Sequence, residues 1–308
     1  MGGPILGESG GGSGAVTGLA ATGLGLLRIG GYLAVTVPLT LIQAFGLLAG
    51  MSYVERLPVF YHRLVCWMLG FRIDVVGERS STQPTLFVAN HVSYLDVEML
   101  GSLIPGCFVA KSDVRDWPVF GWLARLQRTV FVDRRVRSTT AQQRDSMTGR
   151  LQAGTNLILF PEGTSSDGNR VLPFKSALFS AAEIDVGGAP LTVQPVSIGY
   201  TRLDGIPLGR DWRPFLAWYG DMGLAPHLWG AVRLGIVTVV VEFHRPVSIA
   251  EFGTRKRMAE HCHAVISAGL VAANSGRRQP VPAKSSPASP PVAAAPPARD
   301  LDHAVATS

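Results

Sequence analysis

A histidine and an aspartate with four residues between them follow an apolar run early in the chain. The segment 86–96 reads LFVANHVSYLD, and it contains His91 and Asp96. A carboxylate that binds one imidazole nitrogen fixes the tautomer and stabilises the imidazolium, so the other nitrogen can take a proton from a hydroxyl group. This pair of residue types therefore indicates general-base chemistry, provided that the fold brings the two side chains together.

The spacing of the pair restricts where it can lie. On a regular helix, side chains five residues apart point about 140° away from each other. His91 and Asp96 meet only if His91 lies in a strand-to-helix turn and Asp96 in the first helical turn. The alternative is that Ser93 and Asp96 form a capping box and that His91 is an ordinary turn residue. The residues 86–96 alone leave both interpretations open.

Three further blocks follow in a fixed order. They are TVFVDR at 129–134, LFPEGTS at 159–165 and VQPVSI at 193–198. Together with Asn90-His91-x4-Asp96, they resemble the lysophospholipid and 1-acyl-glycerol-3-phosphate acyltransferase family, whose signature is Asn-His-x4-Asp. The resemblance covers roughly residues 85–200, and four blocks in order are far more specific than one.

The resemblance implies roles for individual residues. His91 is the expected general base and Asp96 its orienting partner, while Arg134, Glu162, Gly163 and Thr164 are expected to bind the acceptor and its phosphate. The arginine offers a planar set of donors for phosphate or carboxylate oxygens. The acyl donor is a thioester, which is already activated, so no covalent nucleophile on the enzyme is required.

The acceptor is less well defined than the reaction. Arg128 stands where the family often has glycine, and residues 174–178 read FKSAL where Phe-Lys-x-Gly-Ala is common. The segments 217–222 (AWYGDM) and 226–229 (PHLW) resemble a bacterial branch that also includes lyso-ornithine lipid acyltransferases. We expect 1-acyl-sn-glycerol 3-phosphate as acceptor, giving phosphatidate. The alternative is lyso-ornithine lipid, and a remote alternative is a non-catalytic lipid-binding protein.

Short apolar runs separated by helical stretches predict the elements that position these residues. Expected strands are 73–76, 85–89, 107–110, 129–132, 157–160, 192–198 and 236–243, and expected helices are 95–104, 117–127, 138–152, 174–185 and 251–272. Several strands are apolar throughout, as in strands that are covered on both faces. The sequence predicts an α/β domain over residues 55–272, with a mixed, largely parallel sheet flanked by helices.

A long uncharged segment precedes this domain. We expect residues 1–27 to be a flexible Gly-rich N-terminus and residues 28–54 to form a membrane-anchoring helix, because no charge occurs from Ile29 to Val54. Residues 29–50 would extend about 33 Å as a helix, enough for a bilayer core of about 30 Å. Pro38 and several glycines leave a broken, interfacial helix open. A signal peptide is the other alternative.

The charges around the segment predict its orientation. Arg56, Arg63, Arg72 and Arg79 follow the apolar run and only Arg28 precedes it. The positive-inside rule then places the enzyme on the inner (cytoplasmic) membrane, with its catalytic domain facing the cytoplasm. Residues 55–71 fit either an amphipathic helix on the headgroups or a core-packing helix. The Pro- and Ala-rich tail, 273–308, is expected to be disordered.

Composition limits the partners. Of 308 residues, 47% are hydrophobic and only 16% are charged, with a net charge of +6. Three cysteines, none in a C-x-x-C pattern, argue against a disulfide framework or a cysteine-rich metal site. Residues 111–150 carry nine Lys and Arg against four Asp, a surface suited to anionic headgroups and an acidic carrier protein. We expect a membrane, a lysolipid and acyl-carrier protein or coenzyme A thioesters as partners, and no nucleic acid, metal or cofactor.

Overall fold

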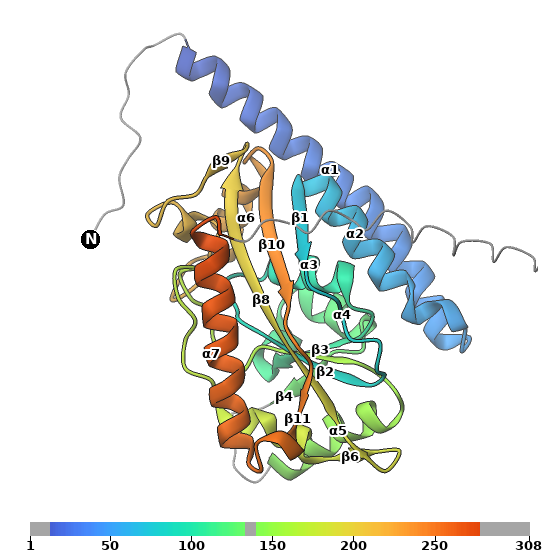
Figure 1. Ribbon diagram of the computed structural model, residues 1–308. Coiled ribbons are helices and arrows are strands. Elements are labelled where there is room, and N and C mark those ends of the chain that lie inside the picture. Colours follow the sequence, from blue (N-terminus) through green and yellow to red (C-terminus); the bar gives the residue numbers. More distant parts are fainter. Residues whose placement is uncertain (1–12, 133–139, 278–308) are drawn as a thin grey trace, which may run out of the picture.

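A mixed β-sheet with helices on both faces organises the chain (Figure 1). The computed structural model describes residues 13–132 and 140–277. The strands are β1 Phe71–Val76, β2 Thr85–Ala89, β3 Cys107–Lys111, β4 Val130–Val132, β5 Leu157–Leu159, β6 Asp185–Val186, β7 Ala189–Pro190, β8 Thr192–Leu203, β9 Ile206–Pro207, β10 Val237–Phe243 and β11 Val247–Ser248. The helices are α1 Ser13–Leu48, α2 Leu57–Leu69, α3 Asp96–Leu103, α4 Phe120–Leu126, α5 Thr140–Gln152, α6 Leu224–Val232 and α7 Arg255–Asn274.

The main sheet has the strand order β1-β10-β8-β2-β5-β3-β4, with β9 and β11 also pairing with β8. The pairs within the run β8-β2-β5-β3-β4 are parallel, and β10 is antiparallel to β8. The predicted mixed, largely parallel sheet is confirmed. The short strands β6 and β7 form a separate hairpin.

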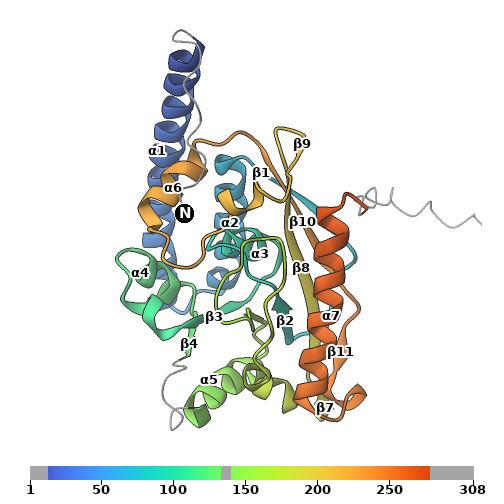
Figure 2. The ribbon, with the colours of Figure 1, turned by 90° about the vertical axis from the view of Figure 1, so that its left-hand side faces the viewer.

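Strand β2 shows why the strands read as continuous apolar runs. Phe87 and Ala89 pack into a core under α2 and α3, while Leu86 and Val88 pack into a second core under α5 and α7. Figure 2 shows α3 on one side of the sheet and α7 on the other. Because both faces of the sheet are covered, the residues that point to either face are buried. The usual alternation of apolar and polar residues is therefore absent.

The connections of β2 and β5 run in opposite directions. The chain leaves β2 through α3 and reaches β3 beyond β5, whereas it leaves β5 through the 3₁₀ helix Ser176–Glu183 and reaches β8 beyond β2. Ligands of open α/β sheets bind in the crevice at the carboxyl ends of the strands, where connections diverge in this way. His91 follows β2 and Glu162 follows β5, so both lie at this point.

Helix α1 corrects the expected N-terminal boundary. It begins at Ser13, so residues 13–27 are helical and not the flexible segment predicted for 1–27; residues 1–12 lie outside the described residues. The prediction was wrong because it was based on the high glycine content of this segment. One of these glycines, Gly25, lies where the helix packs against α6. A Cβ there would lie 2.9 Å from Arg233 Cγ. Arg28 is also not a flanking charge: its guanidinium donates to the carbonyls of Val232, Leu234 and Gly235.

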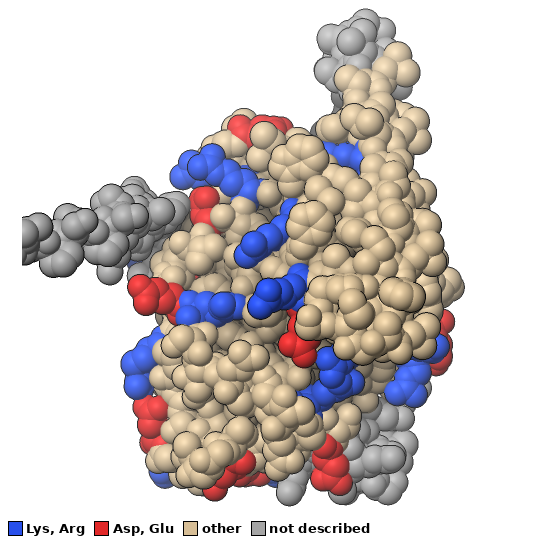
Figure 3. Space-filling model, turned by 90° about the vertical axis from the view of Figure 1, so that its right-hand side faces the viewer, with Lys and Arg blue, Asp and Glu red and all other residues tan. Residues whose placement is uncertain are grey.

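The polar and apolar sides of α1 are the reverse of those of a helix that packs on a domain in water. Its polar side chains face the domain and are buried, namely Arg28, Thr36, Thr40 and Gln43. Large apolar side chains point outward and are exposed, among them Leu27, Val37, Leu41, Phe45 and Leu48. Figure 3 shows a broad uncharged surface on the side of the molecule that carries α1 and α2, bordered by Lys and Arg. One stretch, Gly18–Leu48, is long and apolar enough to cross a membrane.

The remaining boundaries differ by a few residues. Helix α2 packs on α3 and buries His62, Val65 and Cys66, as a core-packing helix does, although Phe60 and Trp67 on its outer side are exposed. Helix α7 continues to Asn274, two residues beyond the predicted domain end. Most of the expected disordered tail, residues 278–308, lies outside the described residues.

Candidate active site

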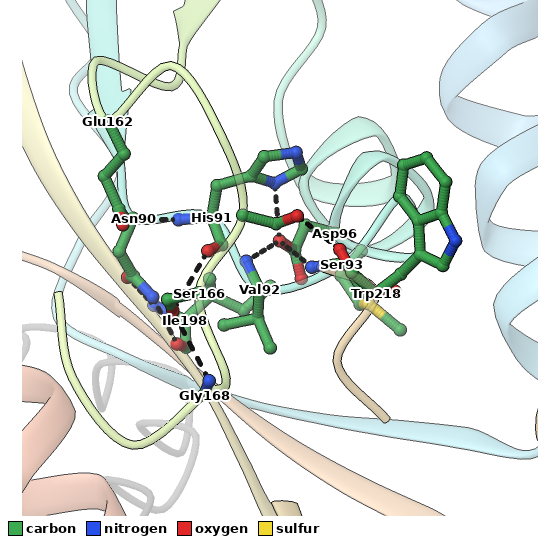
Figure 4. Close-up of polar contacts among 12 residues, drawn as sticks. Asn90, His91, Val92, Ser93, Asp96, Glu162, Ser166, Gly168, Ile198 and Trp218 are labelled. Carbon is green, nitrogen blue, oxygen red and sulfur yellow. Dashed lines mark hydrogen bonds and ion pairs between the residues drawn. The ribbon is translucent and has the colours of Figure 1, made fainter. Parts of the chain in front are cut away.

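The structure brings His91 and Asp96 together at the end of β2. His91 lies in the turn between β2 and α3, and Asp96 is the first residue of α3. His91 Nδ1 lies 2.9 Å from Asp96 Oδ2, and Figure 4 shows the other ring nitrogen directed away from the carboxylate. Because His91 lies in the turn and not on the helix, the two side chains do not point away from each other as they would on a regular helix.

Asp96 is held by donors on all sides. Besides the His91 imidazole, Oδ2 accepts hydrogen bonds from the backbone N–H groups of Val92 at 2.7 Å and Ser93 at 3.0 Å. Oδ1 accepts one from the Tyr200 hydroxyl at 2.8 Å. The aspartate is 0% exposed. A buried carboxylate with four donors has a fixed position and direction, so it also fixes the ring that it binds.

The capping-box alternative accounts for only part of this turn. Asp96 does accept from the Ser93 backbone, as a capping box requires, yet the Ser93 hydroxyl is buried and bonds to none of the described residues. The same carboxylate oxygen binds the imidazole. Asp96 therefore closes the turn and orients His91 at once.

The His91 ring is fixed on one face and open at one nitrogen. It stacks on Phe160 with 4.2 Å between ring centroids. Its side chain is 22% exposed, and Nε2 has no hydrogen-bond partner among the described residues. With Nδ1–H donating to Asp96, Nε2 carries a lone pair. This ring can therefore accept a proton from a group that approaches Nε2.

Glu162 holds the backbone around the site. Its Oε1 accepts from the His91 N–H at 2.7 Å and its Oε2 from the Leu172 N–H at 2.8 Å. Burial raises the pKa of this carboxyl to about 8. The two backbone hydrogen bonds act in the opposite direction and lower the pKa, whereas the charge of Asp96 raises it further. Both oxygens point to backbone donors, so Glu162 links the turn after β5 to the turn after β2.

We expect Glu162→Gln to change how the stability of the protein depends on pH. Because the pKa is higher in the folded state than the ordinary 4.5, the folded protein holds an extra proton between pH of about 4.5 and 8. The unfolding free energy contributed by this group therefore falls as pH rises through that window. The Gln variant lacks this contribution, so its melting temperature should fall less between pH 5 and pH 8 than that of the unsubstituted protein.

Thermal unfolding in detergent at several pH values measures this difference. Glu260→Gln changes the same group at an exposed position of α7 and should keep the original pH dependence. Parallel pH profiles for the Glu162→Gln and unsubstituted proteins would contradict the assignment.

Of the other predicted binding residues, the structure describes Gly163 and Thr164. Gly163 has a φ of 78°, which favours glycine, and lets the chain turn directly after Glu162. Thr164 is exposed on the same turn. Arg134 lies outside the described residues. The structure thus brings Glu162, Gly163 and Thr164 to the same edge of the sheet as His91.

Sequence reasoning missed several residues that shape the site. The Asn90 side chain bonds the backbone N–H and C=O of Ile198, which ties the end of β2 to β8. Tyr200 binds Asp96 from β8, and Ser166 binds the His91 carbonyl through its N–H at 2.9 Å. The position of Asn90 beside His91 in the signature was a usable signal. Nothing local marks Tyr200, because it is 104 residues from its partner.

A cavity of about 200 Å³ lies beside the site. Its walls come from α1, α2, α3, α4 and β3 and are mostly apolar and aromatic. Tyr94, in the turn between His91 and Asp96, lines it. So does Phe108, whose ring stacks on Phe160 at 6.2 Å, and Phe160 in turn stacks on His91. A stack of two aromatic rings, Phe108 and Phe160, therefore runs from the cavity wall to the imidazole.

Comparisons with known proteins show which family the chain resembles. Residues 72–199 match the family model described as Acyltransferase. The chain is 44% identical over 264 residues to the lyso-ornithine lipid O-acyltransferase of Brucella abortus, covering 83% of this chain and 99% of that one. A lyso-ornithine lipid O-acyltransferase of Rhizobium meliloti is 44% identical, covering 74% and 80%. The 1-acyl-sn-glycerol-3-phosphate acyltransferase of Neisseria gonorrhoeae is 33% identical, covering 62% and 74%.

A solved structure shares the fold. The crystal structure of the 1-acyl-sn-glycerophosphate acyltransferase of Thermotoga maritima superimposes with a TM-score of 0.59 at 24% sequence identity. The match covers 83% of this chain and 96% of that one.

Proposed function

Because this chain belongs to the lysolipid acyltransferase family, we propose that its acceptor is lyso-ornithine lipid, to whose free hydroxyl it transfers a fatty acyl group. Its reaction joins a lysolipid and an acyl thioester. The lyso-ornithine enzymes are more similar to this chain, at 44% identity, than the gonococcal enzyme at 33%, and they align over more of it. The alternative acceptor of the sequence analysis is thus favoured over the main one, 1-acyl-sn-glycerol 3-phosphate.

The observation that carries the mechanism is the His91–Asp96 contact with a free Nε2. The acceptor hydroxyl gives its proton to Nε2 as its oxygen attacks the thioester carbonyl, and a new C–O bond forms. The buried Asp96 carboxylate stabilises the imidazolium. When the tetrahedral intermediate collapses, the C–S bond breaks, and the thiolate leaves with the proton from the imidazolium. The products are the acylated lipid and the free thiol, the imidazole returns to its starting state, and no covalent enzyme intermediate forms.

The other residues act in binding and positioning. We propose that Arg134, Gly163 and Thr164 contact the acceptor. Glu162 acts through the backbone, because its oxygens are taken by the His91 and Leu172 amides. A buried carboxyl group between two turns would keep the crevice at a fixed width. This role differs from the substrate-binding role expected of Glu162.

The contacts of α1 with the domain support a specific orientation of this helix in the membrane. The helix touches α6 at Gly25 and Arg28, α2 at Thr36, and the end of α4 at Gln43. These positions span about 27 Å at 1.5 Å per residue. A helix packed along a domain over that length cannot cross a bilayer at right angles without immersing the domain. We infer that α1 lies in the membrane plane with its leucines in lipid, on the cytoplasmic face of the inner membrane.

The proposed acyl carrier, acyl-carrier protein or coenzyme A, rests on the positive charge of exposed residues. Lys111, Arg115 and Arg125 are exposed on and before α4, close to the cavity. A basic surface of this kind suits an acidic acyl-carrier protein and also the phosphates of coenzyme A.

An acceptor panel tests the proposed function. Purified protein in detergent receives a radiolabelled acyl thioester with lyso-ornithine lipid, lysophosphatidate or neither. We expect labelled ornithine lipid to be the main product with acyl-carrier protein or coenzyme A as carrier. Transfer to lysophosphatidate alone would reject the proposed acceptor, and release of free fatty acid without acceptor would indicate a hydrolase.

A further inference from the structure

The cavity beside the active site contains a single carboxylate in an apolar wall. Six aromatic residues line it: Tyr32, Tyr61, Tyr94, Phe108, Trp117 and Phe120. Among the described residues, Glu98 is the one acidic residue in this wall, and no Lys or Arg takes part. A charge in such surroundings is costly unless it is paired. Its pairing therefore decides what the cavity can bind.

The neighbouring His62 binds one oxygen of Glu98. His62 Nδ1 lies 2.7 Å from Glu98 Oε2, and His62 Nε2 lies 2.7 Å from the Gln127 side-chain nitrogen. The His62 ring therefore contacts Glu98 on one side and the Gln127 side chain on the other. This contact occupies one oxygen of the Glu98 carboxylate.

The second oxygen of Glu98 remains available. Oε1 has no hydrogen-bond partner within the part of the chain that the structure describes, and the side chain is 18% exposed, toward the cavity that it lines. Tyr61 lines the same cavity, and burial and then the charge of Glu98 raise the pKa of its hydroxyl above its ordinary value. Aromatic faces attract cations as well.

We propose that Glu98 and the surrounding aromatic rings form a binding site for a primary ammonium group, that of the ornithine side chain of the acceptor. Ornithine ends in a primary amine that is protonated near neutral pH, carried on three methylenes. The methylenes suit the apolar wall, and the ammonium suits the carboxylate. A phosphate would meet a carboxylate there, and no Lys or Arg among the described lining residues. This inference rests on the proposed acceptor and names the residue that would select it.

The position of Glu98 connects the site to the reaction. Asp96 and Glu98 both lie in the first turn of α3, two residues apart, and project about 200° from each other around the helix. One turn of helix therefore carries the carboxylate that orients His91 on one side and the cavity carboxylate on the other. Tyr94, which also lines the cavity, lies just before this turn. An acceptor held at Glu98 would thus be anchored on the helix that orients the base.

Kinetics of Glu98→Gln with two acceptors test the proposal. One acceptor is lyso-ornithine lipid, and the other is the same lipid with its side-chain amine acetylated, which removes the charge. Gln can still accept the hydrogen bond from His62, so the contact between α2 and α3 is kept. We expect KM for lyso-ornithine lipid to rise about 10- to 100-fold, as for a lost hydrogen bond between charged groups, with kcat little changed. KM for the acetylated lipid should not change.

The comparison separates a binding role from a structural one. Glu183→Gln, which removes an exposed carboxylate on the far side of the sheet, should leave both KM values unchanged. An equal rise of KM for both acceptors, or no rise, would overturn the proposal. Should Glu98→Gln fail to fold, Glu98→Asp keeps the charge and must retain the preference for the charged acceptor; loss of that preference would also overturn it. Failure of the proposed function is seen separately, as absence of transfer to lyso-ornithine lipid by the unsubstituted protein.

Discussion

Substituting His91 by alanine is expected to lower kcat for acyl transfer by about 10³-fold, the usual contribution of a positioned general base. The variant removes the one imidazole whose Nε2 is open at the end of β2. Asp96 keeps its hydrogen bonds from Val92, Ser93 and Tyr200, so the turn should persist. The KM for the acceptor should change little, because binding does not depend on the proton transfer.

Transfer of a radiolabelled acyl chain from its thioester to lyso-ornithine lipid measures this effect. His261→Ala is the matched control, since His261 lies on α7 and packs against Phe252, away from the site. A melting temperature close to that of the unsubstituted protein would show that the His91→Ala variant is folded. Near-normal turnover would reject His91 as the base.

The sheet was predictable because each strand carries its own signal. Thr85–Ala89 is apolar after its first residue and is bounded by proline and the Asn-His pair, so both of its ends were placed correctly. The helix Thr140–Gln152 is likewise close to its expected range. Burial on both faces and clear end signals act locally, and local signals can be read from one sequence.

The N-terminal helix was less predictable because its stability is not local. Glycine lowers helix propensity, which is why residues 13–27 were expected to be flexible. An apolar helix in lipid must satisfy its backbone internally, and this requirement outweighs the propensity. The partners of Gly25 and Arg28 lie at the end of α6 and in the residues directly after it, about 200 residues away. No sequence pattern reports such partners.

The site divides in the same way. His91 and Asp96 were predicted from the resemblance of four blocks, because residues 86–96 alone also allow a capping box. The backbone contacts of Glu162 were not predicted, since a carboxylate beside glycine and threonine suggests a ligand-binding loop. Its partners are backbone amides, which every residue has, so the sequence carries no mark of them. Predicting residue types at a site is therefore easier than predicting which group each residue touches.

Replacing Asp96 by asparagine should separate catalysis from folding. The Asn oxygen can keep the three bonds that Oδ2 accepts from His91, Val92 and Ser93. Its NH₂ group would then face the Tyr200 hydroxyl, which can turn and accept. The loss of unfolding free energy should thus stay near 1–2 kcal/mol.

The charge, however, is gone from Asp96→Asn, and the imidazolium that forms during the reaction loses its buried counterion. We expect kcat to fall by about 10³-fold, comparable to the loss of the base itself. Tyr200→Phe is the companion variant: it removes one donor but keeps the charge, so activity should fall by about tenfold or less, the effect of one lost hydrogen bond. Steady-state kinetics and thermal unfolding of the two variants make the comparison. A similar small loss of activity in both would mean that Asp96 only shapes the turn, because a residue that merely closes a turn has no need of its negative charge.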